Sequence, residues 1–463
     1  MCRYTQPTLR SSHGRAAVSV PFLEAGRTPM IAAPAVPLET TFLATVAVVL
    51  IVGIVVVRLV TRLGQPAVIG EILAGIMLGP SLLGLLPGDL VEVLFPTEIR
   101  PYLNSVAQVG LVLFMFVTGW EIDLSWLRRR ARTIAATSIS AMAVPFGLGV
   151  AAAMLLYTHH SVVDGEPVDR LAFSLYLGTA LSITAFPVLV RLLTDKGMQH
   201  GRLGSLALAC AAATDALAWV LLVVVLIIIQ SSGPLSLVVT LGGTAAFVLL
   251  TVLVTRPLLA AAVRRATRTG AHTTLFLIVS AGVLLCSYVT SLIGLHAIFG
   301  AFVFGLVMPR APVDALRHAV ETPMRNICAL LLPIFFIVTG LSVDITTLGP
   351  SGTTDGILII LVACLGKLLG TMVPARLSGM SWRDSAGLGV LLNTRGLTEL
   401  IILEIGRQLH VIDQALFTLM TLMALVTTAM ATPLLRMLGL VPDQQPFLPA
   451  SAAAVATPGP TRT

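Results

Sequence analysis

Residues 203–229 read LGSLALACAAATDALAWVLLVVVLIII and contain a single charged residue, Asp215. The stretch is apolar and long enough for a helix to cross the hydrocarbon core of a bilayer. Asp215 stands within one residue of its centre. A charge at that depth costs about 2.5–3.5 kcal/mol on insertion scales, and such residues face a bundle interior or an aqueous cavity. The stretch predicts a membrane helix, and the position of Asp215 in it favours a functional role for this carboxylate.

The composition of the whole chain agrees with a membrane protein. The 463 residues are 56% hydrophobic and 11% charged, with mean hydropathy +0.95, whereas soluble proteins carry about 25% charged residues. The net charge of +7 is therefore attributed to cytoplasmic loops and not to nucleic-acid binding. The cysteines form no CxxC or Cys/His cluster, so we expect no metal centre and no disulfide framework.

Thirteen segments are apolar enough to span a bilayer. Their approximate limits are 40–60, 68–86, 103–121, 133–157, 171–193, 203–229, 234–256, 272–292, 293–308, 325–342, 356–377, 384–406 and 413–437. Together they predict one membrane domain, residues 37–437. The polar segment 1–36 precedes it, and residues 438–463 are expected to form a disordered tail.

The charges between these segments alternate. Loops after odd-numbered segments are rich in arginine, as at Arg128–Arg130, and loops after even-numbered segments are neutral or acidic, as at Asp164 and Glu166. The positive-inside rule places the arginine-rich loops in the cytoplasm. The N-terminus is then expected outside the cell membrane and the C-terminus in the cytoplasm.

Asp215 and Lys367 are the two mid-membrane charged residues that point most directly to ion or proton binding. Asp215 is expected to bind a cation or a proton, and the hydroxyl of Thr214 beside it is a hard oxygen ligand suited to Na⁺ or K⁺. The alternative is a neutral carboxylic acid that hydrogen-bonds a neighbouring helix. Lys367 is one of two lysines among 29 basic residues. Lysine can lose its proton when it is desolvated and arginine does not, so both a titrating role and a fixed one remain open.

Two segments are interrupted by polar residues and proline. In LSITAFPVL (181–189) these are Ser182, Thr184 and Pro187, and the two hydroxyls are further candidate oxygen ligands. In LLNTRGLTEL (391–400) the interruption includes Asn393, Arg395 and Glu399. Paired interruptions in the two halves of a transporter mark its binding site. Arg395 and Glu399 are four residues apart and are expected to form a structural ion pair.

Other functional classes find no support in the sequence. Neither a phosphate-binding GxxxxGK[ST] loop nor a dinucleotide-binding GxGxxG in a strand–turn–helix context occurs, so ATP-driven pumping and a nucleotide-sensing domain are not expected. No cofactor is implied. A membrane enzyme is not expected either, because no nucleophile–base pair or metal cluster is recognisable. Any active transport would draw on an ion gradient.

The chain resembles the cation:proton antiporter-2 family, nearest its Kef-type and plant cation/proton exchanger branches. The resemblance spans about residues 40–437 and rests on eight motifs in family order. The motifs are QPAVIGEILAGIMLGPSLLG (65–84), ALSITAFPVLVRLL (180–193), AAATDALAWVLL (211–222), GLHAIFGAFVFGLVMPR (294–310), LPIFFIVTGLSVDI (332–345), GKLLGT (366–371), LLNTRGLTELIIL (391–403) and TTAMATPLL (427–435).

This resemblance implies an all-α polytopic membrane protein of about 13 transmembrane helices. Inverted repeats would cross two broken helices inside a core bundle, and a second bundle would form a homodimer. Asp215 matches the ion-carrying second position of the family's paired site, and Lys367 matches the core lysine that can pair with it. The first position of that pair is commonly Asp, Asn or Gln, whereas here it is Thr214. One carboxylate instead of two alters the number of charges moved per cycle.

The sequence thus predicts a secondary antiporter that exchanges H⁺ for K⁺ or Na⁺ by alternating access, with Asp215 binding either the cation or the proton. Lys367 is expected to pair with Asp215 when the cation is absent. Two alternatives stay open: a gated cation channel with the same fold, and an exporter of an organic ion that confers self-resistance.

Overall fold

The regular structure of the described residues is helical, apart from one short hairpin. A computed structural model describes residues 37–121, 131–199, 201–230 and 234–440. The polar segment 1–36 and nearly all of the predicted tail 438–463 lie outside these residues. The α-helices of the described residues are α1 (Leu38–Arg62), α2 (Ala67–Leu78), α3 (Leu90–Leu94), α4 (Arg100–Glu121), α5 (Ala131–Leu156), α6 (Arg170–Ser182), α7 (Phe186–Asp195), α8 (Arg202–Gln230), α9 (Pro234–Leu250), α10 (Arg256–Thr269), α11 (His272–Leu292), α12 (Ala297–Val307), α13 (Val313–Leu316), α14 (Thr322–Leu341), α15 (Gly352–Leu377), α16 (Trp382–Leu392), α17 (Leu397–Gln408) and α18 (Gln414–Met437).

The hairpin pairs β1 (Val162–Val163) with β2 (Glu166–Pro167) in antiparallel register, with Val162 opposite Pro167. It connects α5 to α6. Two π-helical turns, Thr251–Thr255 and Arg317–Glu321, continue directly into α10 and α14.

Ten helical stretches in the described part of the chain are long and apolar enough to cross a membrane, so the protein is an integral, multi-pass membrane protein. The three remaining predicted segments correspond to the broken helices α6–α7 and α16–α17 and to the short helix α12. The total of thirteen crossings stays a prediction. Two boundaries are wrong: residues after 256, expected to be a loop, continue as α10 through the first π turn, and residues 317–321, also expected to be a loop, form the second π turn, which continues into α14.

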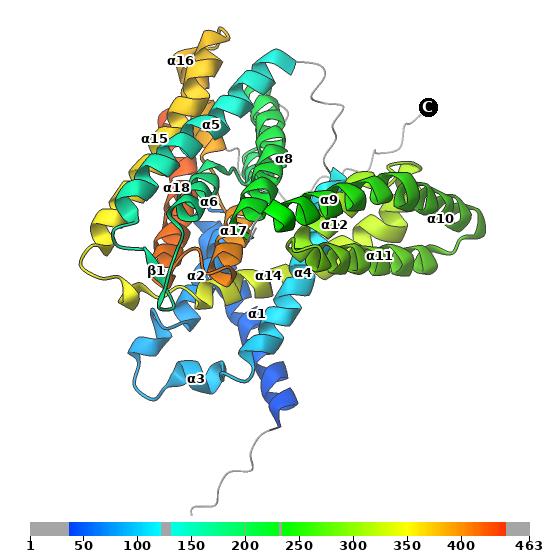
Figure 1. The fold of residues 1–463 in the computed structure, drawn as a ribbon, viewed down its shortest axis with the longest axis horizontal. Helices are drawn as coiled ribbons and strands as arrows, with labels where there is room; N and C mark the ends of the chain where they lie inside the picture. Colours follow the sequence, from blue (N-terminus) through cyan, green and yellow to red (C-terminus); the bar gives the residue numbers. More distant parts are fainter. Residues whose placement is uncertain (1–36, 122–130, 200, 231–233, 441–463) are drawn as a thin grey trace, which may run out of the picture.

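The helices form two groups. Helices α5–α8 and α15–α18 pack on one another, with α15 along α5 and α5 along α6 and α8; we call these the crossing group. Helices α1, α2, α4, α11, α12 and α14 pack together as the flanking group, which α9 and α10 extend. In Figure 1 helices α9–α12 lie to one side, away from α5, α15, α16 and α18.

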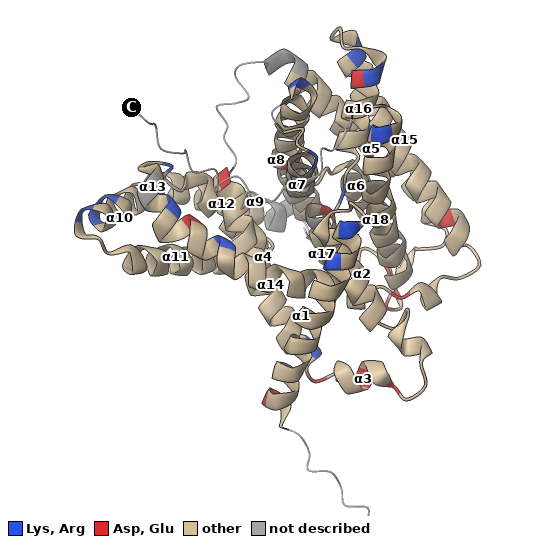
Figure 2. Ribbon diagram, turned by 180° about the vertical axis from the view of Figure 1, so that it is seen from behind, with Lys and Arg blue, Asp and Glu red and all other residues tan. Residues whose placement is uncertain are grey.

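Charged residues are sparse along the helix bodies, apart from the arginines of α10 and the buried residues described below. In Figure 2 blue and red residues gather at helix ends and links, and the long faces of the helices are largely tan. Apolar side chains such as Val239, Leu249 and Leu285 are well exposed on the flanking group, as expected for surfaces that face lipid.

Candidate functional site

The two segments are interrupted, as their sequences predict, and their links meet, as the family resemblance implies. Residues Ile183–Ala185 separate α6 from α7, and Asn393–Gly396 separate α16 from α17. Two hydrogen bonds join these links: the Ala185 amide donates to the Thr394 carbonyl at 3.1 Å, and Thr184 Oγ1 donates to the Leu392 carbonyl at 3.1 Å. Each break therefore satisfies backbone groups freed by the other, which irregular backbone at membrane depth requires.

The last carbonyls of α6 are bound by side chains from other helices. Arg395 donates to the Ala180 and Leu181 carbonyls at 3.3 and 2.7 Å, and Lys367 donates to the Ser182 carbonyl at 2.5 Å. The C-terminal end of a helix carries a partial negative charge. Two cations from α15 and the second broken segment thus neutralise one buried helix end.

Lys367 joins three elements. Besides the Ser182 carbonyl, its Nζ donates to the Ala141 carbonyl of α5 at 3.1 Å and to Thr184 Oγ1 at 2.8 Å. The side chain is fully buried. An ammonium has three donors and no acceptor, and here each donor has an oxygen within reach. Within the described ranges no ion pair connects Lys367 to Asp215, so the expected pairing is not present in this structure.

Arg395 and Glu399 form the ion pair that their spacing predicts. Arg395 Nη1 lies 3.1 Å from Glu399 Oε1, and both side chains are fully buried. Thr428 of α18 holds the backbone of Arg395. Its hydroxyl accepts from the Arg395 amide at 2.8 Å and donates to the Arg395 carbonyl at 2.7 Å. The predicted pair is confirmed, and its surroundings support a structural role.

Asn393 lies at the end of α16. Its backbone N–H donates to the Gly389 carbonyl at 3.0 Å, and its side-chain Nδ2 lies 3.6 Å from Cys364 Sγ. The side-chain oxygen is buried and has no hydrogen-bond partner among the described residues. Asn393 thus offers one free carbonyl oxygen at the crossing.

Asp215 occupies the middle of α8, which packs against α5, α6, α7 and α16. Its side chain is fully buried, and neither carboxylate oxygen has a hydrogen-bond partner in the described part of the chain. Buried carboxylates are normally paired, hydrogen-bonded or bound to a cation. The geometry thus leaves two hard oxygen ligands beside both broken helices, as a site for a cation or a proton needs.

The three hydroxyls predicted as ligands are already hydrogen-bonded. Thr214 Oγ1 donates to the Ala211 carbonyl at 3.0 Å, and Ser182 Oγ donates to the Thr179 carbonyl at 2.7 Å. Both oxygens keep lone pairs for a cation. Thr184 Oγ1 differs, because it donates to the Leu392 carbonyl and accepts from Lys367. It could serve as a ligand only after Lys367 moves.

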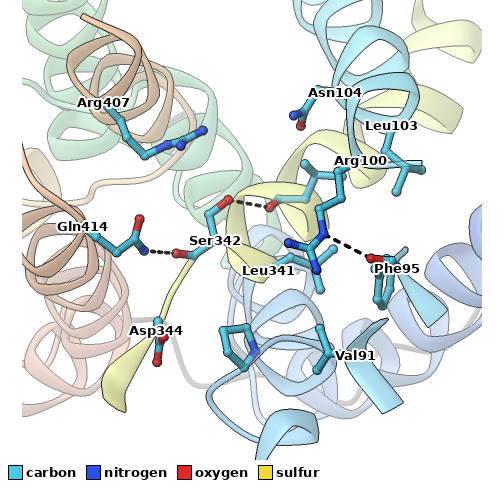
Figure 3. A pocket seen from close by; sticks show the side chains of 12 residues that line it. Val91, Phe95, Arg100, Leu103, Asn104, Leu341, Ser342, Asp344, Arg407 and Gln414 are labelled. Atoms are coloured by element: carbon cyan, nitrogen blue, oxygen red, sulfur yellow. Dashed lines mark hydrogen bonds between the residues drawn. The ribbon is translucent and has the colours of Figure 1, made fainter. Parts of the chain in front are cut away.

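Two cavities lie in the seam between the groups, on the face predicted to lie outside. One, of ≈ 330 Å³, is lined by Arg100 and Asn104 of α4, Ser342 after α14, Arg407 of α17 and Gln414 of α18. Figure 3 shows these side chains around it, with Gln414 donating to the Ser342 carbonyl.

The second cavity, of ≈ 340 Å³, is lined by Gln108 of α4, Leu226 of α8, His296 before α12 and Gln408 of α17. Both cavities therefore bring residues of the flanking group opposite residues of the crossing group.

Sequence reasoning missed two participants. The Ala141 carbonyl is a backbone group with no sequence signal. Thr428 lies in the motif TTAMATPLL, but nothing in that motif says which of its hydroxyls reaches the crossing. Only the packing of α18 against α17 selects it.

Comparison with known proteins gives one consistent result. The family model for the sodium/hydrogen exchanger, transmembrane, matches residues 45–439. A Na(+)/H(+) antiporter, NhaS4, of Synechocystis is 35% identical over 86% of this chain and 97% of its own length. Cation/H(+) antiporter 19 of Arabidopsis thaliana is 36% identical over 84% of this chain and 49% of its own length.

A yeast relative, K(+)/H(+) antiporter 1 of Saccharomyces cerevisiae, is 32% identical over 80% of this chain and 42% of its own length. The chain thus spans about half the length, or slightly less, of the plant and yeast relatives that it matches.

The fold also matches a solved structure. The sodium proton antiporter MjNhaP1 of Methanocaldococcus jannaschii superposes with a TM-score of 0.62 at 17% identity, over 87% of this chain and 99% of that one. At this identity the match concerns the fold alone. With two crossed broken helices, a buried mid-helix carboxylate and a family model that covers most of its length, this chain belongs to the sodium/hydrogen exchanger family of transmembrane proteins.

Proposed function

We propose that the protein exchanges a monovalent cation, K⁺ or Na⁺, for H⁺ across the membrane by alternating access, with Asp215 binding one or the other. The observation that supports this most directly is the buried carboxylate whose oxygens have no partner among the described residues. Relatives named for Na⁺/H⁺ and for K⁺/H⁺ exchange agree with a monovalent cation.

Each predicted site residue has a place in this scheme. Asp215 is the ion carrier, Thr214 and Ser182 supply additional oxygen ligands, and Thr184 joins them when Lys367 withdraws. Because one carboxylate cannot hold a proton and a cation together, competition for Asp215 couples the two flows without a further device. Asn393, Arg395 and Glu399 maintain the crossing around the site.

The exchange is proposed to be one-for-one. Thr214 is neutral, so Asp215 is the sole acid of the pair, and the three hydrogen bonds of Lys367 fit a lysine that keeps its charge through the cycle. One proton then leaves for each monovalent cation that enters, and no net charge moves.

The location, topology and oligomeric state of the protein are proposed from its sequence. The arginine distribution favours a multi-pass protein of the cell membrane, with the N-terminus outside and the C-terminus in the cytoplasm. Residues 37–437 form the exchanger domain, and the family resemblance favours a homodimer.

Purified protein in lipid vesicles with an enclosed pH-sensitive dye tests the function. External K⁺ or Na⁺ should make the lumen alkaline as H⁺ leaves, and Asp215→Asn should abolish the signal because an amide cannot exchange a proton. Asp384→Asn is the matched control: Asp384 lies in the first turn of α16, where it bonds Ser381, and it should leave exchange intact.

Two results would contradict the proposal. Exchange at near wild-type rate in Asp215→Asn would remove Asp215 from the site. Cation uptake that continues with no opposing H⁺ movement would favour a channel.

A further inference from the structure

Trp219 lies one helical turn after Asp215, on the same side of α8, because residues four apart share a helix face. Its side chain is 2% exposed, and its indole Nε1 has no hydrogen-bond partner in the part of the chain that the structure describes. The Asp215 carboxylate, one turn earlier on the same face, also has no hydrogen-bond partner among the described residues. A buried donor without an acceptor and a buried acceptor without a donor are thus neighbours on α8, and each is costly to leave unsatisfied.

The indole ring rests on the other helix group. It packs edge-on against Phe299 at 5.8 Å and tilted against Phe302 at 5.9 Å between ring centroids, and both phenylalanines belong to α12. That helix is held close to α4: a Cβ atom added at Gly119 would lie 2.3 Å from the Phe302 carbonyl oxygen. Trp219 is therefore a side chain of the crossing group supported by a platform of the flanking group.

We propose that Trp219 is a positioning residue for Asp215, whose indole N–H donates to the carboxylate when the proton is absent. The proposal rests on the exchange function proposed above. A hydrogen bond to the charged form of an acid favours that form, so the indole biases Asp215 towards the deprotonated state that a cation can bind. Because the ring leans on α12, a relative movement of the two groups alters this bond.

The first test replaces Trp219 by phenylalanine, which keeps an aromatic ring and removes the N–H. Without the donor, protons compete better for Asp215. The acid-side midpoint of the exchange rate should move about one pH unit higher, and the apparent KM for the cation at acid pH should rise about tenfold. The maximal rate at alkaline pH should stay near that of the wild type.

Trp120→Phe is the matched control. It also removes a partly buried indole donor, since Trp120 Nε1 donates to the Pro309 carbonyl at 3.2 Å, but it does so away from Asp215. Its pH profile should coincide with the wild-type profile. If Trp219→Phe leaves the profile unchanged, or lowers the rate by the same fraction at every pH, Trp219 only packs and the proposal is overturned.

A second measurement serves if Trp219→Phe does not fold. The indole ¹⁵N–¹H resonance of Trp219, recorded in otherwise wild-type protein at alkaline pH, should shift when K⁺ or Na⁺ is added, and not in Asp215→Asn. A resonance that ignores the cation overturns the proposal. The outcomes separate the two proposals: if the wild type exchanges, Asp215→Asn does not and Trp219→Phe behaves as the wild type, the function stands and the role of Trp219 falls.

Discussion

Lys367 is fully buried, and its Nζ donates to the carbonyls of Ala141 and Ser182 and to the hydroxyl of Thr184. Its depth and its rarity in an arginine-rich chain predicted a role for this lysine. Its partners could not be predicted, because two of them are backbone carbonyls, Ala141 and Ser182, contributed by residues far away in the chain. Whether the lysine titrates therefore depends on its surroundings in the fold, and its three oxygen contacts favour a lysine that keeps its charge.

The first prediction concerns the charge that the cycle moves. If Lys367 stays protonated, cation-driven H⁺ flux in vesicles should not change with membrane potential, although 100 mV is worth about 2.3 kcal/mol per charge moved. The potential is set with an ion that the protein does not carry. A clear change of rate and end point with potential would contradict one-for-one exchange. If Lys367→Gln then removed that dependence while exchange continued, the lysine would be the second proton carrier.

The broken helices show the same limit at the scale of an element. Polar residues and proline in 181–189 and 391–400 predicted both interruptions, and the spacing of Arg395 and Glu399 predicted their ion pair. The sequence did not predict which backbone groups Lys367 and Arg395 would bind, because nothing in the sequence of α6 marks the carbonyls that accept their hydrogen bonds. It also misplaced the end of the segment at 256, because a π turn there continues the helix where the arginines suggested a loop.

The second prediction concerns Thr428, which holds the link between α16 and α17. Thr428→Val keeps the side-chain shape and deletes the hydroxyl that bonds both the amide and the carbonyl of Arg395. We expect the variant to lose about 1–3 kcal/mol of stability and to exchange more slowly, because the crossing loosens. A thermal melt in detergent and the vesicle assay measure both effects.

The neighbouring threonine is the control. Thr427 is equally buried, and among the described residues its hydroxyl bonds carbonyls of its own helix alone, those of Met423 and Ala424. Thr427→Val should therefore be nearly neutral. Equal losses in the two variants would show that Thr428 does not act through the broken helix.

At the scale of the whole molecule, each helix group is tightly packed inside and meets the other across a looser seam. Within the flanking group a Cβ atom at Gly75 would lie 2.2 Å from the Ile337 carbonyl oxygen, and within the crossing group one at Gly370 would lie 2.6 Å from the Ser140 carbonyl oxygen. Small residues at these positions let the helix backbones within each group approach closely. The outer cavities, by contrast, lie between the groups. This arrangement fits two bodies that move relative to each other.

Cross-linking tests that movement. Gln108 and Gln408 line one cavity from opposite groups. In a background that lacks the native cysteines, Gln108→Cys with Gln408→Cys should lose exchange after treatment with a short, cleavable bifunctional thiol reagent, and should recover it when the link is cut. Each single cysteine variant, treated identically, controls for modification alone. Undiminished exchange in the cross-linked protein would contradict alternating access by movement of the two groups.

In the proposed exchange, cation and proton compete for one carboxylate, Asp215. The most direct measurement is the apparent KM for K⁺ or Na⁺ in vesicles as a function of pH, with the pH equal on both sides at the start. Competition predicts that KM rises about tenfold for each pH unit on the acid side, while the maximal rate reached at saturating cation stays constant. A KM that does not change with pH, accompanied by a maximal rate that falls as pH falls, would mean that the proton binds elsewhere and would contradict the account.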